Sequence, residues 1–124
     1  MIQPLALIIE DDQGLATIFA QALKTSEFET EVISAGDIAL ARLAEVIPAI
    51  VVLDLHLPGV SGKNILKYIR SDDRLADTRV MVATADPHMA DSLEDEPDLV
   101  LVKPISFIQL RDLAARLRPP DITA

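Results

Sequence analysis

The stretch IVVLDLHLPGVSG at residues 50–62 decides the fold of this chain. It starts with four apolar residues, stops on the carboxylate of Asp54 and then enters a loop that contains proline and glycine. A continuous apolar run bounded by turn residues is typical of a strand buried on both faces, as in a parallel sheet. Asp54 would then lie at the carboxyl end of that strand, where open α/β sheets place their ligand sites. Taken alone, the residue is equally well interpreted as a helix cap or a loop aspartate.

A second apolar run, residues 5–9, also ends on acidic residues, and strand-like and helix-like segments alternate along the rest of the chain. The alternation predicts a doubly wound, five-stranded parallel sheet with about five helices. The expected strands are 5–9, 29–34, 50–54, 79–84 and 98–102, and the expected longer helices are 14–25, 37–47, one starting near residue 61, and 106–117.

Helix 14–25 has an apolar stripe at helical spacing, and helix 37–47 should end before Pro48. The fourth helix should be short, because residues 86–97 are densely acidic and interrupted by proline, so at most two turns are expected. The two stripes consist of Leu15, Ile18, Phe19, Ala22 and Leu23 in the first helix, and of Leu40, Leu43, Ala44 and Ile47 in the second.

Length and composition indicate one domain, residues 1–118, followed by a tail, 119–124, in which Pro119 and Pro120 stop the last helix. The chain contains no cysteine, which excludes disulfides and thiolate metal sites. No run approaches the ~20 apolar residues of a membrane span, so we expect a cytoplasmic protein. The net charge of −9 argues against nucleic acid or an anionic membrane as a direct partner.

The carboxyl ends of parallel strands meet at one edge of a sheet, so the polar residues that follow these strands should converge there. Carboxylates packed together repel one another unless a cation lies among them, and Mg²⁺ suits such oxygen ligands. A lysine and a hydroxyl beside a carboxylate suit the handling of a phosphoryl group, with the carboxylate as nucleophile. Each element is weak evidence alone, and the conjunction is strong. The converging residues are Glu10, Asp11, Asp12, Asp54, Thr84 and Lys103.

Four segments together resemble the receiver domain of bacterial two-component response regulators, the CheY-like family. They are LIIEDD at 7–12, LDLHLPGVSG at 53–62, ATA at 83–85 and VKP at 102–104. The resemblance covers residues 4 to about 118. It implies a flavodoxin-like fold of the receiver type and a role in a two-component or phosphorelay system.

By this resemblance Asp54 is the phosphoacceptor. Glu10 and Asp11 are the acidic pair, and Mg²⁺ would be bound directly by Asp11, by Asp54 and by the backbone carbonyl of His56. Asp12 is the additional acid often found beside this pair.

The same resemblance assigns roles to Thr84, which would hydrogen-bond the phosphoryl group, and to Lys103, which would pair with it. It also implies a cis peptide bond between Lys103 and Pro104, which is feasible because X-Pro bonds reach cis at low cost. Two features depart from the family. Val100 occupies the switch position, where a tyrosine or phenylalanine is usual, and the stretch from Thr84 to Lys103 is a few residues short and lacks the usual Gly-Ala step.

Several residues should lie at the edge of the pocket: Asp12, His56, Ala85 and Asp86. His56 and Asp86 could direct water onto a phosphoryl group, or they could simply be exposed loop residues. The acidic stretch between Arg79 and Lys103, which contains no lysine or arginine, is either a solvated face or a docking patch for a basic partner.

The preferred function is a module that accepts a phosphoryl group from a sensor histidine kinase or a histidine phosphotransfer protein and then changes its binding to a downstream protein. The alternative is a receiver-like interaction module that is not phosphorylated. A phosphatase acting on external substrates is disfavoured, because that chemistry usually needs a second acid two residues after the nucleophile, where His56 stands. We therefore expect no enzymatic activity beyond self-catalysed phosphorylation and dephosphorylation.

Overall fold

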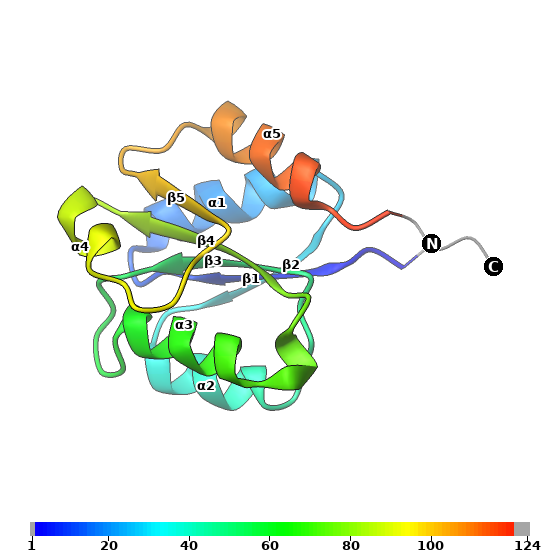
Figure 1. The fold of residues 1–124 in the computed structure, drawn as a ribbon. Coiled ribbons are helices and arrows are strands. Elements are labelled where there is room, and N and C mark those ends of the chain that lie inside the picture. Colours follow the sequence, from blue (N-terminus) through cyan, green and yellow to red (C-terminus); the bar gives the residue numbers. More distant parts are fainter. Residues whose placement is uncertain (1, 121–124) are drawn as a thin grey trace.

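The computed structural model describes residues 2–120, and its centre is a parallel sheet of five strands in the order β2-β1-β3-β4-β5. Figure 1 shows the sheet between two layers of helices. This is the predicted doubly wound architecture. The strands are β1 (Leu5–Ile9), β2 (Glu29–Ile33), β3 (Ile50–Asp54), β4 (Arg79–Thr84) and β5 (Leu99–Val102).

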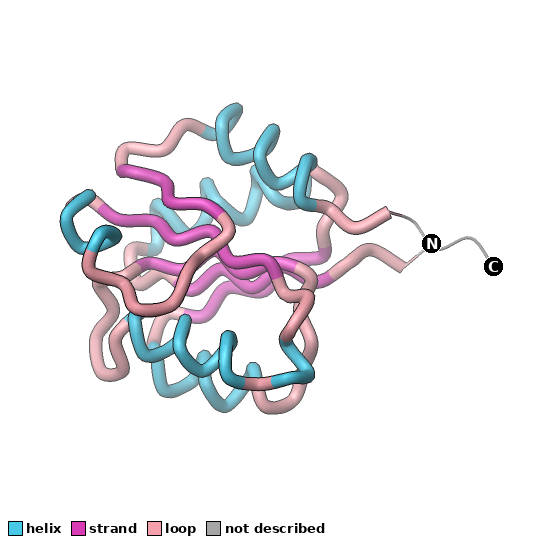
Figure 2. Tube along the Cα trace, viewed as in Figure 1, coloured by secondary structure: helices cyan, strands magenta, loops and turns pink. Residues whose placement is uncertain are grey.

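Two helices cover each face of the sheet: α1 and α5 lie on one face, and α2 and α3 lie on the other (Figures 1 and 2). The short α4 lies at the end of the sheet where β4 terminates. None of the helices in the described part of the chain has the length and apolar character needed to cross a bilayer. The helices are α1 (Gln13–Thr25), α2 (Gly36–Leu43), α3 (Gly62–Ser71), α4 (Pro87–Asp91) and α5 (Phe107–Leu117), with a 3-10 turn at Asp73–Leu75.

The apolar runs form strands because both faces of the central strands are covered. All five residues of β3 are buried, and their side chains alternate between two cores, with Val52 facing α1 and α5 and Val51 facing α2 and α3. Burying this much Leu, Ile and Val surface is the main favourable term in folding. The strand is therefore fixed in register, and its last residue, Asp54, is fixed with it.

The strand order places the carboxyl ends of β1 and β3 side by side at the centre of the sheet. The chain leaves β1 for β2 on one side and returns to β3 on the other, with Ile9 opposite Leu53 in the register. Ligands of open α/β sheets bind at such a reversal of strand order. The acidic residues that follow Ile9 thereby come next to Asp54.

Helix α2 is shorter than predicted. It ends at Leu43, whereas the sequence predicted an end at residue 47. Ile47 is consequently 61% exposed and does not belong to a buried stripe, and Ala44 is exposed as well. The residues before Pro48 are biased away from helical geometry, and here the unwinding extends back by a full turn. In α1 the buried face is centred on Phe19 and Leu23, which leaves Ile18 at its side, 44% exposed.

The acidic segment that follows α4 is tied down onto α3. The guanidinium of Arg70 donates to the carbonyl of Glu96 (3.0 Å), to the carbonyl of Thr78 (3.1 Å) and to Asp98 Oδ2 (2.9 Å). The prediction of a short fourth helix is confirmed, since α4 has five residues. The remaining residues, 92–98, form an irregular strap of turns and bends in place of further helical turns.

Asp98 anchors this strap to the rest of the domain. Its carboxylate accepts from the backbone N–H of Val80 (2.7 Å) and from the guanidinium groups of Arg70 and Arg79. Partial burial raises the pKa of Asp98, but these three donors outweigh that effect and hold the pKa below its ordinary value. The ionised carboxylate therefore stabilises the folded state.

Pro119 and Pro120 follow α5, as expected for the end of the last helix. The rest of the predicted tail, residues 121–124, lies outside the described residues.

Asp98→Asn should lower the free energy of unfolding at neutral pH by about 1–3 kcal/mol, because two guanidinium groups lose a charged acceptor. Asp91→Asn, an exposed acid in α4, is the matched control and should change it by less than about 0.5 kcal/mol. Urea unfolding at several pH values measures both. The stabilisation by Asp98 is present above its ordinary pKa of 3.8 and is lost as the pH falls through the lowered value, so wild type and Asp98→Asn should converge in acid. Equal stabilities at pH 7 would contradict this role.

Candidate functional site

Polar side chains from three strand ends meet at the carboxyl edge of the sheet. Glu10 follows β1 directly and Asp54 is the last residue of β3. One carboxylate oxygen each from Glu10, Asp11 and Asp54 lies within 4.8 Å of the others. The predicted convergence of these carboxylates is therefore present in the structure.

Lys103, directly after β5, brings a positive charge into this cluster. Its Nζ lies 2.7 Å from Glu10 Oε1 and 3.6 Å from Asp54 Oδ1. Its backbone N–H donates to the carbonyl of Thr84 (2.8 Å), which fixes the residue against the end of β4. The peptide bond from Lys103 to Pro104 is cis, as the resemblance implied.

The charges in this cluster shift one another's protonation. Burial, followed by the neighbouring Asp54 carboxylate, raises the pKa of Glu10 to about 7, although the ammonium of Lys103 works against this shift. Burial lowers the pKa of Lys103, but its hydrogen bond to Glu10 and the negative charge of Asp54 outweigh that effect and raise it. The lysine therefore stays charged while the carboxylates remain crowded.

The donor set fits a hard divalent cation. Three carboxylates meet with a single lysine among them, and Asp11 is exposed, so the cluster opens to solvent on that side. Asp54 itself is buried, and its Oδ1 accepts the backbone N–H of His56 (3.0 Å), which places the backbone of residue 56 at the carboxylate. Oxygen ligands with room for water are the coordination that Mg²⁺ prefers.

Thr84 is fully buried at the end of β4, next to β3, and its hydroxyl is bonded to the start of α4. The hydroxyl accepts the backbone N–H of Asp86 (3.0 Å) and donates to the carbonyl of the same residue (3.1 Å). Asp86 in turn caps α4 by accepting the N–H of His88 (2.9 Å). Thr84 thus connects the site to the fourth helix.

The residues expected at the pocket edge fall into two groups, the cap of helix α1 and three exposed loop residues. Asp12 Oδ1 accepts the N–H of Leu15 and caps α1, so it is outside the group of three carboxylates. His56, Ala85 and Asp86 are exposed loop residues beyond β3 and β4. Their placement is compatible with a role at the mouth of the site and equally with simple exposure.

Val100, at the position of the usual aromatic switch residue, lies on the edge strand β5 opposite Val82. The residue is 40% exposed. A valine here has little surface to bury in either of two positions.

Gly62 is a residue of the site that the sequence reasoning missed. A Cβ at this position would lie 2.5 Å from the carbonyl oxygen of Asp54 and 2.6 Å from Cα of Leu55. The first turn of α3 can approach the end of β3 this closely only because the residue has no side chain. The loop sequence contained the signal, as a glycine directly after the cap Ser61 of a helix.

The comparisons with known proteins agree with this fold. The model of the response regulator receiver domain family matches residues 6–115. The chain therefore belongs to this family, and the resemblance seen in its motifs is confirmed.

The individual relatives share only moderate sequence identity with this chain. RegX3 of Mycobacterium tuberculosis (strain CDC 1551 / Oshkosh), a sensory transduction protein, is 35% identical over 112 residues, and the DNA-binding response regulator MtrA of strain H37Rv is 31% identical over the same length. Each match covers 90% of this chain and 48% of the relative, so the chain spans about half the length of these proteins. The CheY-like receiver domain from Methylobacillus flagellatus superposes with a TM-score of 0.79 at 25% identity, covering 95% of this chain and all of that one.

Gly62→Ala should lower the free energy of unfolding by about 1–3 kcal/mol, because the added Cβ forces the start of α3 away from the backbone of Asp54. Gly14→Ala, in the first turn of α1, is the control: its Cβ would meet only a side-chain oxygen, at 3.3 Å, and alanine is the better helix residue. Thermal or urea unfolding compares the two variants. A Gly62→Ala protein as stable as Gly14→Ala would show that the close approach is unimportant.

Proposed function

We propose that this domain accepts a phosphoryl group on Asp54 and thereby acts as a signalling module of a two-component or phosphorelay system. The observation that carries the proposal is the position of Lys103, whose ammonium lies between the carboxylates of Glu10 and Asp54 at the carboxyl edge of the sheet. Membership of the receiver family supports assigning Asp54 as the nucleophile, Glu10 and Asp11 as the acidic pair and Lys103 as the neighbouring cation.

In the proposed reaction a carboxylate oxygen of Asp54 attacks the phosphorus of a phosphohistidine, carried by a sensor histidine kinase or a histidine phosphotransfer protein. The new O–P bond forms as the N–P bond breaks, and its electron pair leaves with the imidazole nitrogen, which takes up a proton. Because the backbone N–H of His56 holds Asp54 Oδ1, the carboxylate is fixed before the donor arrives. Transfer of this kind depends mainly on positioning and on charge stabilisation.

The residues that would hold Mg²⁺ are Asp11, Asp54 and Glu10, with the backbone carbonyl of His56 as a further ligand. When bound, the ion would offset the charge of the carboxylates and of the phosphoryl oxygens. The buried Glu10 contributes by keeping Lys103 in place through their 2.7 Å contact.

After transfer, Lys103 and Thr84 would each contact a phosphoryl oxygen. Lys103 already lies 3.6 Å from Asp54 Oδ1 and has to exchange part of its contact with Glu10 for the new anion. Thr84 would have to release Asp86, because its hydroxyl is occupied by that residue. The phosphorylated state is thereby linked to the start of α4.

The proposed role is regulatory, in the cytoplasm, without turnover of external substrates. MtrA is named as a DNA-binding response regulator, but this chain spans about half of it and carries a net charge of −9. We therefore propose a protein as the direct downstream partner of this domain, and no direct contact with nucleic acid or membrane.

Asp54→Asn should abolish the mass increase that the wild type shows with Mg²⁺ and a small phosphodonor such as phosphoramidate, because the amide is not a nucleophile for phosphorus. Asp73→Asn, an exposed acid in the 3-10 turn, removes the same charge and should be labelled like the wild type. Intact-protein mass spectrometry reads both. Full labelling of Asp54→Asn would refute the assignment, and an unlabelled wild type with this donor and with a phosphohistidine donor would favour the alternative, an unphosphorylated interaction module.

Mg²⁺ should raise the melting temperature, because it relieves the repulsion that folding creates among Glu10, Asp11 and Asp54. Ligand linkage gives about 2–3 kcal/mol at one hundred times the dissociation constant. Asp11→Asn should remove most of this gain and should itself stabilise the metal-free protein, since one of the crowded charges is gone. If millimolar Mg²⁺ leaves the melting temperature of the wild type unchanged, the result would count against a preformed site.

Phosphorylation should change the structure of α4 and of the strap that follows it. Val100 stands where an aromatic residue usually moves between two positions, and a valine can bury little surface in either of them. The hydroxyl of Thr84, in contrast, is hydrogen-bonded directly to the start of α4. Amide shifts of free and beryllofluoride-treated protein should differ most in residues 85–98 and in the loop after Asp54. A dimer that forms through α4, β5 and α5 only on activation, detected by sedimentation, would contradict this expectation.

A further inference from the structure

A cavity lies at the opposite end of the sheet from Asp54, where the strands begin. Its volume is about 510 Å³, within the range of small-molecule sites. Residues from the segments before β1, β3 and β4, from the start of β4 and from the end of α5 line it. The proposed function makes no use of this cavity.

The walls of this cavity are largely apolar. Pro4, Ile47 and Leu117 contribute to them, together with the proline pair Pro119 and Pro120. Ile47 is 61% exposed, and it comes to the surface because α2 ends early. An apolar body that entered the cavity would remove this surface from water.

The hydrogen-bond donors of several polar groups that line the cavity already have partners within the protein. The hydroxyl of Thr78 donates to the carbonyl of Pro48 (2.7 Å), so its one O–H donor is already used. The backbone N–H groups of Ala49 and Arg79 are bonded to the carbonyls of Leu5 and Ala49. A ligand is therefore selected by the apolar walls and by the charges at the rim.

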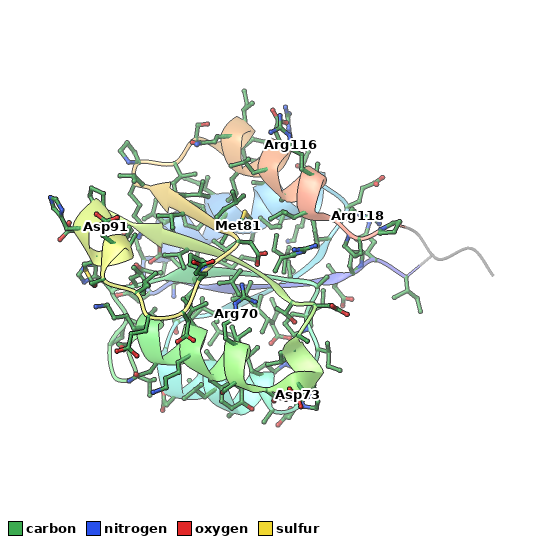
Figure 3. The ribbon with its side chains drawn as sticks, in the orientation of Figure 1. Arg70, Asp73, Met81, Asp91, Arg116 and Arg118 are labelled. Carbon is green, nitrogen blue, oxygen red and sulfur yellow. The ribbon has the colours of Figure 1, made fainter. Side chains whose placement is uncertain are left out.

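The rim carries a positive charge that contrasts with the rest of the domain. Three arginines, Arg79, Arg116 and Arg118, and one acid, Asp77, line the cavity, although the whole chain has a net charge of −9. Arg79 shares its charge with Asp98, and the guanidinium of Arg118 donates to the carbonyl of Glu27. Arg116 is exposed and forms no ion pair within residues 2–120. Figure 3 labels Arg116 and Arg118 at the end of α5, far from Asp91 in α4.

We propose that this cavity is a binding site for a small amphipathic anion, a molecule with an aromatic or aliphatic body and one carboxylate or sulfonate group. The apolar walls take the body, and Arg116 with its neighbours pairs with the acid. A guanidinium is suited to this contact, since its planar donors match a carboxylate or a sulfonate.

The site is physically separate from the phosphoryl site. The cavity residues precede β3 and β4, whereas Asp54 and Thr84 end these strands. Five residues of extended chain span roughly 16 Å, so the two sites lie at least one strand length apart. Binding here neither needs nor blocks the proposed phosphoacceptor.

Titration with 8-anilinonaphthalene-1-sulfonate, followed by its fluorescence, tests the proposal. The uncharged analogue N-phenyl-1-naphthylamine has a similar apolar body without the acid and isolates the contribution of charge. Arg116→Glu reverses one charge at the rim. Arg111→Glu makes the same change on the same helix, outside the cavity, at a residue paired with Asp112. Because such dyes also bind loosely packed states, unchanged melting temperatures of both variants are established first.

The expected result is saturable binding of one sulfonate per chain, weakened about fivefold or more by Arg116→Glu and less than about twofold by Arg111→Glu. The uncharged analogue should bind more weakly than the sulfonate and should respond equally little to both variants. Amide shifts on titration should centre on Asp77 and Leu117. Absence of saturable binding, equal affinity for the two dyes, equal effects of the two variants, or shifts centred elsewhere would overturn the proposal.

Discussion

The ammonium of Lys103, placed between the carboxylates of Glu10 and Asp54, is the interaction on which the candidate site depends. Burying carboxylates side by side is unfavourable unless they are paired or protonated. One lysine cannot neutralise Glu10, Asp11 and Asp54 together, and burial, followed by the nearby Asp54 carboxylate, raises the pKa of Glu10. In the proposed function the crowded carboxylates would attract a cation, and the fixed lysine would pair with an added anion.

The fold supplies this arrangement through strand order and close packing. β1 and β3 are neighbours, so the residue after Ile9 comes beside Asp54, and the N–H of Lys103 bonds to the end of β4. Gly62 lets α3 start directly against the backbone of Asp54. These backbone constraints hold the charged groups together against their mutual repulsion, and the apolar cores on both faces of the sheet supply the stabilisation that this needs.

Much of this could be predicted from the sequence. Apolar runs ending in Asp54, Glu10 and Thr84 indicate parallel strands whose ends converge, and topology alone then brings the side chains together. The early end of α2, the arginine that ties the acidic strap to α3 and the contact of Gly62 with Asp54 could not be predicted, because they depend on tertiary packing. Asp12 shows the remaining ambiguity: its carboxylate caps α1, an ordinary role that one sequence cannot distinguish from ligation.

A crystal structure of the protein with Mg²⁺ and beryllofluoride tests the central claim most directly, because this group stands for a phosphoryl group on a carboxylate. The account predicts beryllium on a carboxylate oxygen of Asp54, Lys103 Nζ within hydrogen-bonding distance of a fluorine, the ion on the carboxylates of Asp11 and Asp54, and the Thr84 hydroxyl turned away from Asp86. Beryllofluoride bound elsewhere, or Lys103 still paired only with Glu10 beside a modified Asp54, would contradict it.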